Sequence, residues 1–265
     1  MRVALTIAGS DPTGGAGLQA DLQVFRALGV HGAGVVTALT VQDTGRVHRV
    51  LPAFPNVVLE QLRVLLADVR PHAVKLGMLA TDDVARNVEL GLQALDRPGQ
   101  PRPPLVVDPV LAASDGTPLL ERRAIPSLER LIARCELVTP NLPEAAALTG
   151  CDVSTREGTE AAGCALVSHL GAGAALVKGG HRDGPPDDLL VVRQGGSQSL
   201  RWLPGERIEG GPVHGTGCAL SAAIAACLAR GEALEVAVER GRRFVAKALE
   251  GAAQAGRVAR FLSYF

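Results

Sequence analysis

Short runs of apolar residues alternate along the chain with longer segments in which apolar residues recur every three or four positions. The short runs predict buried strands at Val3–Ala8, Gly34–Leu39, Ala73–Leu76, Leu105–Val107, Leu137–Thr139 and Ala174–Val177. The longer segments predict amphipathic helices, among them Leu18–Leu28, Val84–Leu95 and Ala161–Leu170, the last preceded by Ser154 and Glu157 in the pattern of a capping box. This alternation predicts an α/β fold with a mostly parallel central sheet between two layers of helices.

The length favours one large domain. The chain has 265 residues, of which 47% are hydrophobic, enough for a sizeable core. The richest cluster of turn-forming residues, Arg97–Pro104, is followed at once by a predicted strand, so it indicates a surface loop and not a domain linker. We therefore expect a single domain over residues 1–265, with ligands bound beyond the carboxyl ends of the parallel strands.

Composition excludes several classes of function. The net charge is +0 and aromatic residues make up only 3%, so neither a basic footprint nor a base-stacking surface for nucleic acid is expected. The five cysteines form no C-x-x-C pair and are odd in number, which speaks against a disulfide framework or a zinc site. The apolar run at the N-terminus is too short for a signal sequence, and no membrane-spanning segment occurs. We expect a cytoplasmic protein with no membrane partner.

A glycine-rich loop, Gly9–Gly17, follows the first predicted strand and opens a helix. Glycines allow a ligand to approach the backbone, and a helix N-terminus attracts anions. A dinucleotide-binding interpretation rests on the G-x-G-x-x-A spacing that starts at Gly15 and on Asp43 further along. It is weakened by the distance of Gly15 from the strand and by the negative charge of Asp11. A plain strand-to-helix turn is the other alternative, and the chain contains no G-x-x-x-x-G-K-[ST] sequence.

The segment His214–Ser221 opens a helix rich in small residues that runs over Ala219–Ala229. Gly215 and Gly217 allow a nest of backbone N–H groups that binds an anion. Cys218 falls in the first turn, where a helix N-terminus lowers a thiol pKa toward neutral. Such a thiol could take a proton from a substrate hydroxyl while the nest stabilises a transferred phosphoryl group. The alternative is a small cysteine buried in an alanine-rich core helix.

Other polar residues follow predicted strands. Asn141 and Glu144 lie one helical turn apart and could hold hydrated Mg²⁺, although capping of a helix explains them equally. Lys178 is one of only three lysines and could contact phosphate as a point charge, or lie solvated in a loop. Gln42 carries a donor and an acceptor that could read the edge of a heterocycle. Asp108 ends another buried strand.

These motifs occur in the order found in a known family. The segments concerned are Ala4–Asp11, Gly14–Leu22, Thr37–Gln42, Lys75–Leu79, Asp108–Val110, Thr139–Ala145, Val177–His181 and His214–Cys218. From about residue 3 to about residue 250 the chain resembles the hydroxymethylpyrimidine/phosphomethylpyrimidine kinases of thiamine biosynthesis, a branch of the ribokinase superfamily. One such segment alone is only suggestive, whereas the ordered set is specific.

The resemblance implies a three-layer α/β/α ribokinase-like fold with a mostly parallel central sheet and no separate lid domain, and commonly a homodimer. It implies ATP and Mg²⁺ as cofactors. The expected reaction is phosphorylation of 4-amino-5-hydroxymethyl-2-methylpyrimidine, a small-molecule substrate, and then of its monophosphate.

The resemblance also implies roles for individual residues. Cys218 would be the catalytic base, with Gly215, Thr216 and Gly217 around the transferred group. Substrate contacts would come from Gly9, Asp21, Gln42, Met78 and Val110. Contacts with ATP or phosphate would come from Lys178, Asn141, Thr216 and Gly217, and metal ligation from Asp108, Asn141 and Glu144.

Three departures from the family pattern bear on these roles. Ala113–Gly116 reads Ala-Ser-Asp-Gly where the family usually has Ala-Lys-Ser-Gly, which removes a mobile cation and puts handling of the monophosphate in doubt. Asp43 stands where the family usually has Asn. The tail Arg257–Phe265 lacks the usual Gly-Pro-x-x-His ending, which affects the edge of the nucleotide site.

Three alternative functions remain open from the sequence. A pyridoxal kinase of the same fold would act on a similar hydroxymethyl heterocycle, although Gln42 favours the pyrimidine. A nucleotide-binding oxidoreductase would rest on the glycine spacing from Gly15. A non-catalytic pyrimidine-binding protein is disfavoured by the intact Gly215–Cys218 segment.

Overall fold

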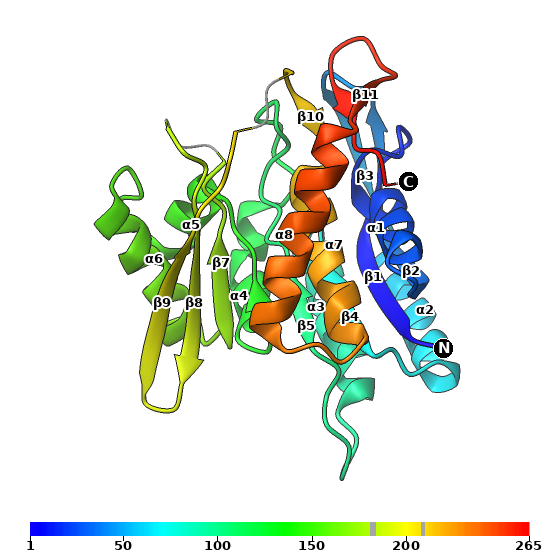
Figure 1. Ribbon diagram of the computed structural model, residues 1–265. Helices are drawn as coiled ribbons and strands as arrows, with labels where there is room; N and C mark the ends of the chain where they lie inside the picture. The colour runs from blue at the N-terminus through cyan, green and yellow to red at the C-terminus, as the bar shows by residue number, and fades with distance from the viewer. Residues whose placement is uncertain (181–183, 208–209, 265) are drawn as a thin grey trace.

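The protein is built around one large sheet. The computed structural model describes residues 1–180, 184–207 and 210–264. Within those residues the sheet has the strand order β3-β2-β1-β4-β5-β6-β7-β8-β9 (Figure 1). The strands are β1 (Val3–Ser10), β2 (His31–Gln42), β3 (Val47–Pro52), β4 (Ala73–Leu76), β5 (Leu105–Val107), β6 (Leu137–Val138), β7 (Ala174–Val177), β8 (Asp188–Gln194) and β9 (Ser197–Leu203).

The centre of the sheet is parallel and its edges are antiparallel. Strands β2, β1, β4, β5, β6 and β7 pair in parallel, whereas β3 at one edge and β8 and β9 at the other run antiparallel to their neighbours. The carboxyl ends of the parallel strands therefore lie along one edge, at the top of Figure 1. Loops that leave these strands converge there, which is where such sheets bind ligands.

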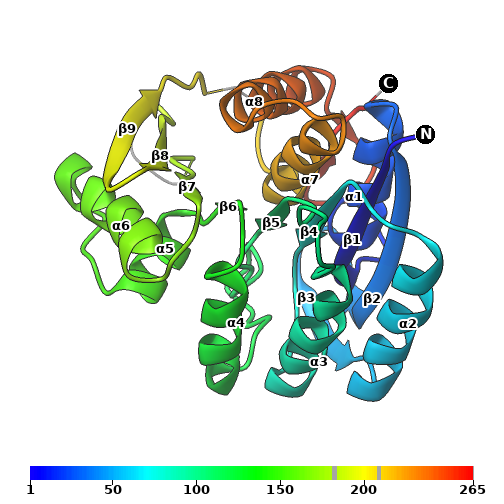
Figure 2. The same ribbon diagram turned by 90° about the horizontal axis from the view of Figure 1, so that it is seen from below.

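Helices cover both faces of the sheet and give three layers (Figure 2). One layer holds α1 (Gly17–Ala27), α7 (Thr216–Ala229) and α8 (Leu234–Glu250). The other holds α2 (Pro55–Asp68), α3 (Asp82–Leu92), α4 (Ile125–Ile132), α5 (Leu142–Thr149) and α6 (Arg156–Ser168), with short 3-10 turns at Gln93–Leu95 and Arg122–Ala124. A small second sheet joins β10 (Val213–His214), β12 (Arg260–Phe261) and β11 (Ala253–Gln254).

Alternate residues of each central strand supply the two halves of the core. In β1, Leu5 and Ile7 pack against α2 and α3, whereas Ala4 faces α1 and α7. Residues of β5 alternate in the same way, with Val106 on the α7 side. Because both faces are covered, these strands are apolar throughout, and that continuous pattern is what made them readable from the sequence.

The predicted α/β/α architecture is confirmed, with differences at element boundaries. Strand β2 extends beyond Gly34–Leu39 at both ends, and α7 begins at Thr216 and not at Ala219. The predicted capping box at Ser154 is wrong, because α6 is capped by the adjacent Thr155, whose hydroxyl accepts a hydrogen bond from the Gly158 amide at 3.0 Å. The two hydroxyl residues are neighbours, and spacing alone did not distinguish them.

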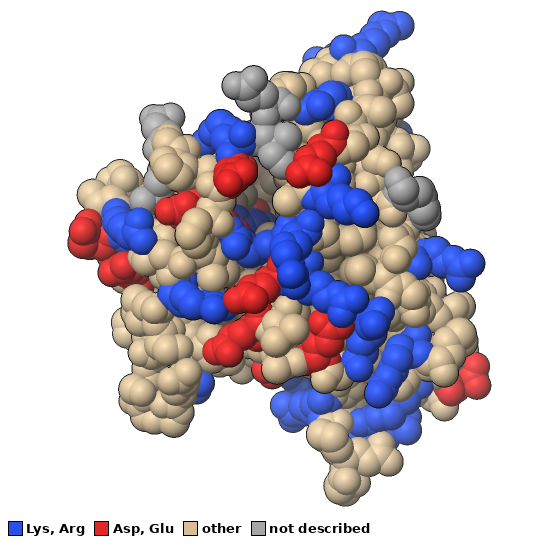
Figure 3. All heavy atoms as spheres, in the orientation of Figure 1, with Lys and Arg blue, Asp and Glu red and all other residues tan. Residues whose placement is uncertain are grey.

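Charges of both signs mix on the face that carries α8 (Figure 3). Arg242 on α8 pairs with Asp188, and Arg240 with Glu232, so part of the positive charge is neutralised locally. Among the described residues, no helix has both the length and the apolar character needed to cross a bilayer.

Candidate active site

A cavity of about 390 Å³ opens at the carboxyl edge of the parallel strands. Nearly all the residues singled out in the sequence line it: Gly9, Gln42, Met78, Asp108, Val110, Asn141, Glu144, Lys178, Gly215, Thr216, Gly217 and Cys218. They come from loops after different strands and from the N-terminus of α7. The topology therefore gathers into one cavity groups that are up to 209 residues apart in the chain.

The N-terminus of α7 forms an open cup of backbone amides. Gly215 precedes the helix with φ +79°, and a Cβ there would lie 1.8 Å from the Gly15 carbonyl oxygen. Only glycine permits both the left-handed backbone and this close approach. Within the described part of the chain no side chain caps the helix. The first-turn N–H groups therefore remain available to an anion, as predicted for Gly215–Cys218.

Cys218 lies in the first turn of α7 and its thiol accepts a hydrogen bond from the Gly17 amide at the start of α1. Burial in the cavity wall raises the pKa of this thiol to about 11, with Lys75 opposing the rise and Asp21 and Asp108 adding to it. The prediction of a pKa lowered toward neutral is therefore wrong. Helix-terminal position was visible in the sequence, whereas desolvation and the nearby carboxylates come from the tertiary fold.

A buried ion pair lies behind the cavity wall. Lys75 on β4 donates to both carboxylate oxygens of Asp21 on α1 at 3.0 and 2.8 Å, and Thr6 on β1 donates to Asp21 at 2.6 Å. Burial alone would lower the pKa of Lys75, but the neighbouring acidic groups, Asp21 first, outweigh burial and raise that pKa. Burial raises the pKa of the Asp21 carboxyl, and Lys75 opposes that rise.

The Lys75–Asp21 ion pair bears on the substrate contact predicted for Asp21. Its side chain is fully buried and does not line the cavity, whereas the Lys75 side chain does. In this structure Asp21 reaches the cavity only through the Lys75 ammonium, so a direct substrate contact is not what the arrangement provides. Lys75 itself was not assigned a role from the sequence. The available signals were its place inside an otherwise apolar strand and the scarcity of lysine.

A second ion pair stands beside the amide cup. Lys178, just after β7, donates to Asp108 at 2.9 Å, and Ser221 on α7 donates to the other Asp108 oxygen at 3.2 Å. A Cβ on Gly217 would lie 3.2 Å from the Lys178 ammonium, which places this cation against the N-terminus of α7. Burial would raise the pKa of Asp108, but Lys178 and Lys75 hold it below its usual value.

Asn141 and Glu144 form the capping box of α5. The Asn141 side chain accepts from the Glu144 amide and the Glu144 carboxylate accepts from the Asn141 amide, both at 2.8 Å. Both residues also line the cavity, so capping and ligand binding are compatible. Burial raises the pKa of Glu144 to about 7, helped by Asp108 and opposed by Lys178.

The donor set fits a magnesium ion that keeps part of its water. Among the described residues, no cluster of three His, Cys, Asp or Glu side chains is arranged to hold a metal. Asp108 nevertheless adds to the rise in the pKa of Glu144, an effect that a bound divalent cation would oppose. One or two carboxylates completed by water and phosphate oxygens is the usual protein site for Mg²⁺.

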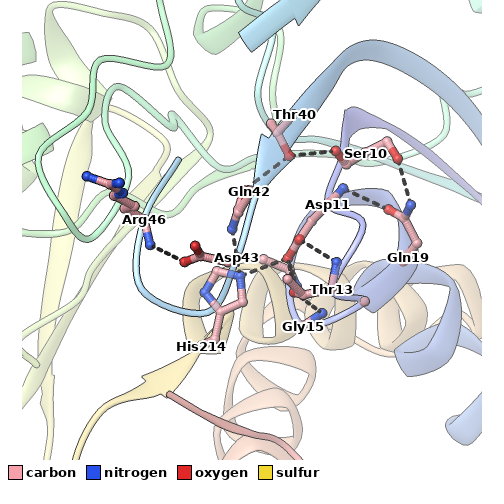
Figure 4. Close-up of polar contacts among 12 residues, drawn as sticks. Ser10, Asp11, Thr13, Gly15, Gln19, Thr40, Gln42, Asp43, Arg46 and His214 are labelled. Atoms are coloured by element: carbon pink, nitrogen blue, oxygen red, sulfur yellow. Dashed lines mark hydrogen bonds and ion pairs between the residues drawn. The ribbon is translucent and has the colours of Figure 1, made fainter. Parts of the chain in front are cut away.

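At the other end of the cavity, Gln42, His214 and Asp11 meet (Figure 4). The His214 Nε2 atom lies 2.8 Å from Asp11 Oδ2 and 3.0 Å from Gln42 Nε2. Asp11 also accepts from the amides of Thr13 and Ala16 at 2.9 Å. These are amides that a pyrophosphate would need in the dinucleotide-binding interpretation. The Asp11 carboxylate already accepts hydrogen bonds from these amides, so they are not free to bind a pyrophosphate.

The loop that departs from the family pattern is tied to the β2–β3 hairpin. Asp115 accepts from the Val47 amide and from the Thr117 amide, each at 2.9 Å. These backbone hydrogen bonds, led by that of Thr117, lower the pKa of Asp115. Asp115, the acid that this loop adds, is therefore an anchor of the loop, and Ser114 stands where the family usually has lysine. His181 and Phe265 lie outside the described residues.

The family model described as phosphomethylpyrimidine kinase matches residues 11–262. The chain belongs to this family. It is 36% identical over 259 residues to the hydroxymethylpyrimidine/phosphomethylpyrimidine kinase of Staphylococcus aureus strain MRSA252, a match that covers 97% of this chain and 91% of that protein. It is thus a phosphotransferase of the type expected from the ordered motifs.

Two solved structures extend this finding to the fold. The phosphomethylpyrimidine kinase of Clostridium difficile 630 is 33% identical with a TM-score of 0.81, covering 94% of this chain and 100% of that one. A Bacillus subtilis pyridoxal kinase, solved as an ADP complex, is 28% identical with a TM-score of 0.86, covering 100% and 97%. The ribokinase-like fold is therefore confirmed, and it is shared by kinases named for two different heterocycles.

Proposed function

We propose that this kinase transfers the γ-phosphoryl group of ATP to the hydroxymethyl group of 4-amino-5-hydroxymethyl-2-methylpyrimidine, and then phosphorylates the resulting monophosphate. The observation that carries the proposal is one continuous cavity with a heterocycle-reading amide, Gln42, at one end and a cation beside an amide cup, Lys178 and Gly217, at the other. The Cys218 thiol lies in the wall of the same cavity.

The Gln42 end has the character of a pocket for a small flat ring. Met78 belongs to a small apolar cluster with Ala38 and Ala80, and Val110 packs against it. Gly9 faces Met78 so closely that a Cβ would lie 2.8 Å from the Met78 sulfur. An apolar wall of this kind would hold a heterocycle by its faces, while Gln42 reads its edge.

The opposite end would hold the phosphates. The amides of Gly215–Cys218 and the Lys178 ammonium would bind the transferred group, whose charge grows in a loose transition state. Asp108, Asn141 and Glu144 would hold Mg²⁺, which neutralises phosphate charge when bound. In the same proposal Lys178 is released from Asp108 in part, because phosphate oxygens compete for its donors.

Cys218 would accept the proton that the substrate hydroxyl gives up as its oxygen attacks phosphorus and the bond to ADP breaks. Only the thiolate can do this. The Lys75 ammonium and the Gly17 amide are the groups that stabilise the negative sulfur. Removal of the thiol in Cys218→Ala would leave binding intact and slow the transfer.

Pyridoxal kinase is the second candidate, favoured by the similarity to the Bacillus subtilis enzyme. The deciding experiment is an ATP-consumption assay with the pyrimidine, its monophosphate and pyridoxal measured side by side. Preference for the pyrimidine supports the proposal, and preference for pyridoxal replaces it. Activity with the pyrimidine but not with its monophosphate would restrict the proposal to the first step and attribute the loss to Ser114 and Asp115.

A homodimer belongs to the same proposal. Leu39, Val41 and Leu51 on β2 and β3 are exposed, and so is Phe54 at 81%, just before α2. Large apolar side chains gathered on one edge of a sheet favour an interface. Sedimentation of the purified protein tests this, and the Phe54→Ser variant is expected to shift the distribution toward the monomer.

A further inference from the structure

The side-chain amide of Gln42 is held at both of its polar atoms (Figure 4). Its oxygen position lies 3.1 Å from the Thr40 hydroxyl, and its nitrogen position lies 3.0 Å from His214 Nε2. Each of these two partners has a second neighbour. The Thr40 hydroxyl lies 3.0 Å from the Ser10 carbonyl oxygen, and His214 Nε2 lies 2.8 Å from Asp11 Oδ2.

In this arrangement the Thr40 hydroxyl would have to donate two hydrogen bonds, and His214 Nε2 would have to donate and accept at once. The Ser10 carbonyl can only accept, so it takes the single hydroxyl hydrogen of Thr40 and leaves none for the Gln42 oxygen. The Asp11 carboxylate can likewise only accept, so His214 must carry its proton on Nε2. An N–H on His214 then faces an N–H of Gln42, which is repulsive.

Both conflicts disappear if the Gln42 amide is turned by half a rotation about its last bond. The Gln42 oxygen then accepts from His214 Nε2–H, which is shared with Asp11. One Gln42 N–H donates to the Thr40 oxygen, and the Thr40 hydroxyl still donates to Ser10. Nitrogen and oxygen of an amide occupy nearly the same positions, so the network decides between the two orientations.

We propose that His214 is a positioning residue that fixes the orientation of the Gln42 amide, so that Gln42 offers an N–H donor to the ring of the substrate. In this orientation one Gln42 N–H has no hydrogen-bond partner among the described residues, and Gln42 lines the cavity. A ring nitrogen with a free lone pair would be accepted there. A ring N–H at the same place would be rejected.

The C-terminal segment holds His214 in place. Strand β12 pairs in parallel with β10, which sets Phe261 beside His214, and the two rings meet edge to face with centroids 6.5 Å apart. On the other side a Cβ at Gly15 would lie within 2.6 Å of both rings, so the glycine loop closes the packing. The tail that departs from the family ending therefore supports the Gln42 end of the cavity.

The first test needs no measurement of activity. Nitrogen-15 spectra of the six imidazoles of the free enzyme at pH 8 report which ring nitrogen carries the proton, and the His214 signals are those missing from the His214→Gln variant. We expect a protonated Nε2. An unprotonated Nε2 would overturn the proposal, because His214 would then accept from Gln42 as drawn.

The second test measures binding and turnover and rests on the proposed function. His214→Phe keeps a ring packed against Phe261 and removes the nitrogens. It is expected to raise Kd and KM for the pyrimidine about tenfold, the effect of one lost hydrogen bond to a polar partner, with KM for ATP changed less than about twofold. His214→Gln, which keeps an N–H near the position of Nε2, is expected to recover most of the loss. The matched control is His31→Phe, at the exposed opposite end of β2.

The outcomes separate the two proposals. Unchanged pyrimidine affinity in a folded His214→Phe variant would overturn the positioning role, as would a uniform loss for pyrimidine and ATP. A wild-type enzyme that does not phosphorylate the pyrimidine would overturn the proposed function, while the imidazole spectra would still decide the orientation of Gln42. Thermal melting of each variant establishes that it is folded.

Discussion

Ionisation of Cys218 can be measured directly by the pH dependence of alkylation. With a pKa of about 11, the thiolate fraction at pH 7.5 is roughly 3 in 10,000, whereas an ordinary cysteine of pKa about 8.5 is about 10% ionised. Because the thiolate is the reactive form, Cys218 is expected to react about 300-fold more slowly than an ordinary cysteine on this ground alone. Its rate is expected to rise about tenfold per pH unit from pH 7 to pH 10.

The assay is limited reaction with iodoacetamide followed by mass spectrometry of the cysteine-containing peptides, with half-buried Cys151 as internal reference. Replacing the opposing ammonium in Lys75→Met is expected to slow Cys218 further at every pH. A plateau of the Cys218 rate near pH 9 in the wild-type enzyme would refute the reasoning. Such a result would mean that water in the cavity solvates the sulfur and that the N-terminus of α7 outweighs burial.

Three more predictions concern the same site. Cys218→Ala is expected to reduce kcat by roughly 10²–10⁴ with little change in KM for ATP, measured by coupled ADP release; near-normal turnover would remove the thiol from the reaction. Lys75→Met is expected to lower the free energy of unfolding in urea by about 3–5 kcal/mol, because it leaves Asp21 buried without its cation. The double variant Lys75→Met with Asp21→Leu should recover much of this loss. Equal losses for the single and the double variant would contradict a coupled pair. Folding raises the pKa of Glu144 from 4.5 to about 7. Its ionisation therefore destabilises the folded state by up to about 3 kcal/mol as the pH rises through that window. Glu144→Gln should flatten the pH dependence of the free energy of unfolding between pH 4.5 and 7. A wild-type profile that is already flat would show that Glu144 is ionised in the fold.

The architecture was predictable because both faces of the sheet are covered. Apolar runs such as Ala73–Leu76 and Ala174–Val177 match their strands to the residue, and the loops after them carry the polar groups of the cavity. The segment Gly215–Cys218 was predictable for a related reason. Its glycines and its place before an alanine-rich helix fix the local backbone without reference to the rest of the chain.

The electrostatics were not predictable from spacing. Lys75 and Asp21 are 54 positions apart, and they are brought together by the packing of α1 against β1 and the pairing of β1 with β4. The acidity of Cys218 depends on that pair and on burial, so the helix-terminal argument gave the opposite sign. Asn141 and Glu144 left two interpretations open because one side chain can cap a helix and also line a cavity.

Two of the three lysines of this arginine-rich chain stand at the site, and each ammonium lies against a glycine. A Cβ would come within 2.8 Å of Lys75 Nζ at Gly77 and within 3.2 Å of Lys178 Nζ at Gly217. A planar guanidinium needs more room than an ammonium, so arginine could not take either place without moving the backbone. Each lysine is also neutralised by one aspartate at rest. The two lysine–aspartate pairs therefore carry no net charge before any phosphate enters. The two pairs differ in depth, since Asp21 is sealed in the core, whereas Lys178 keeps 16% of its side chain exposed. In the proposed reaction the Lys178 pair would open to receive an incoming phosphate, and the Lys75–Asp21 pair would stay intact behind Cys218.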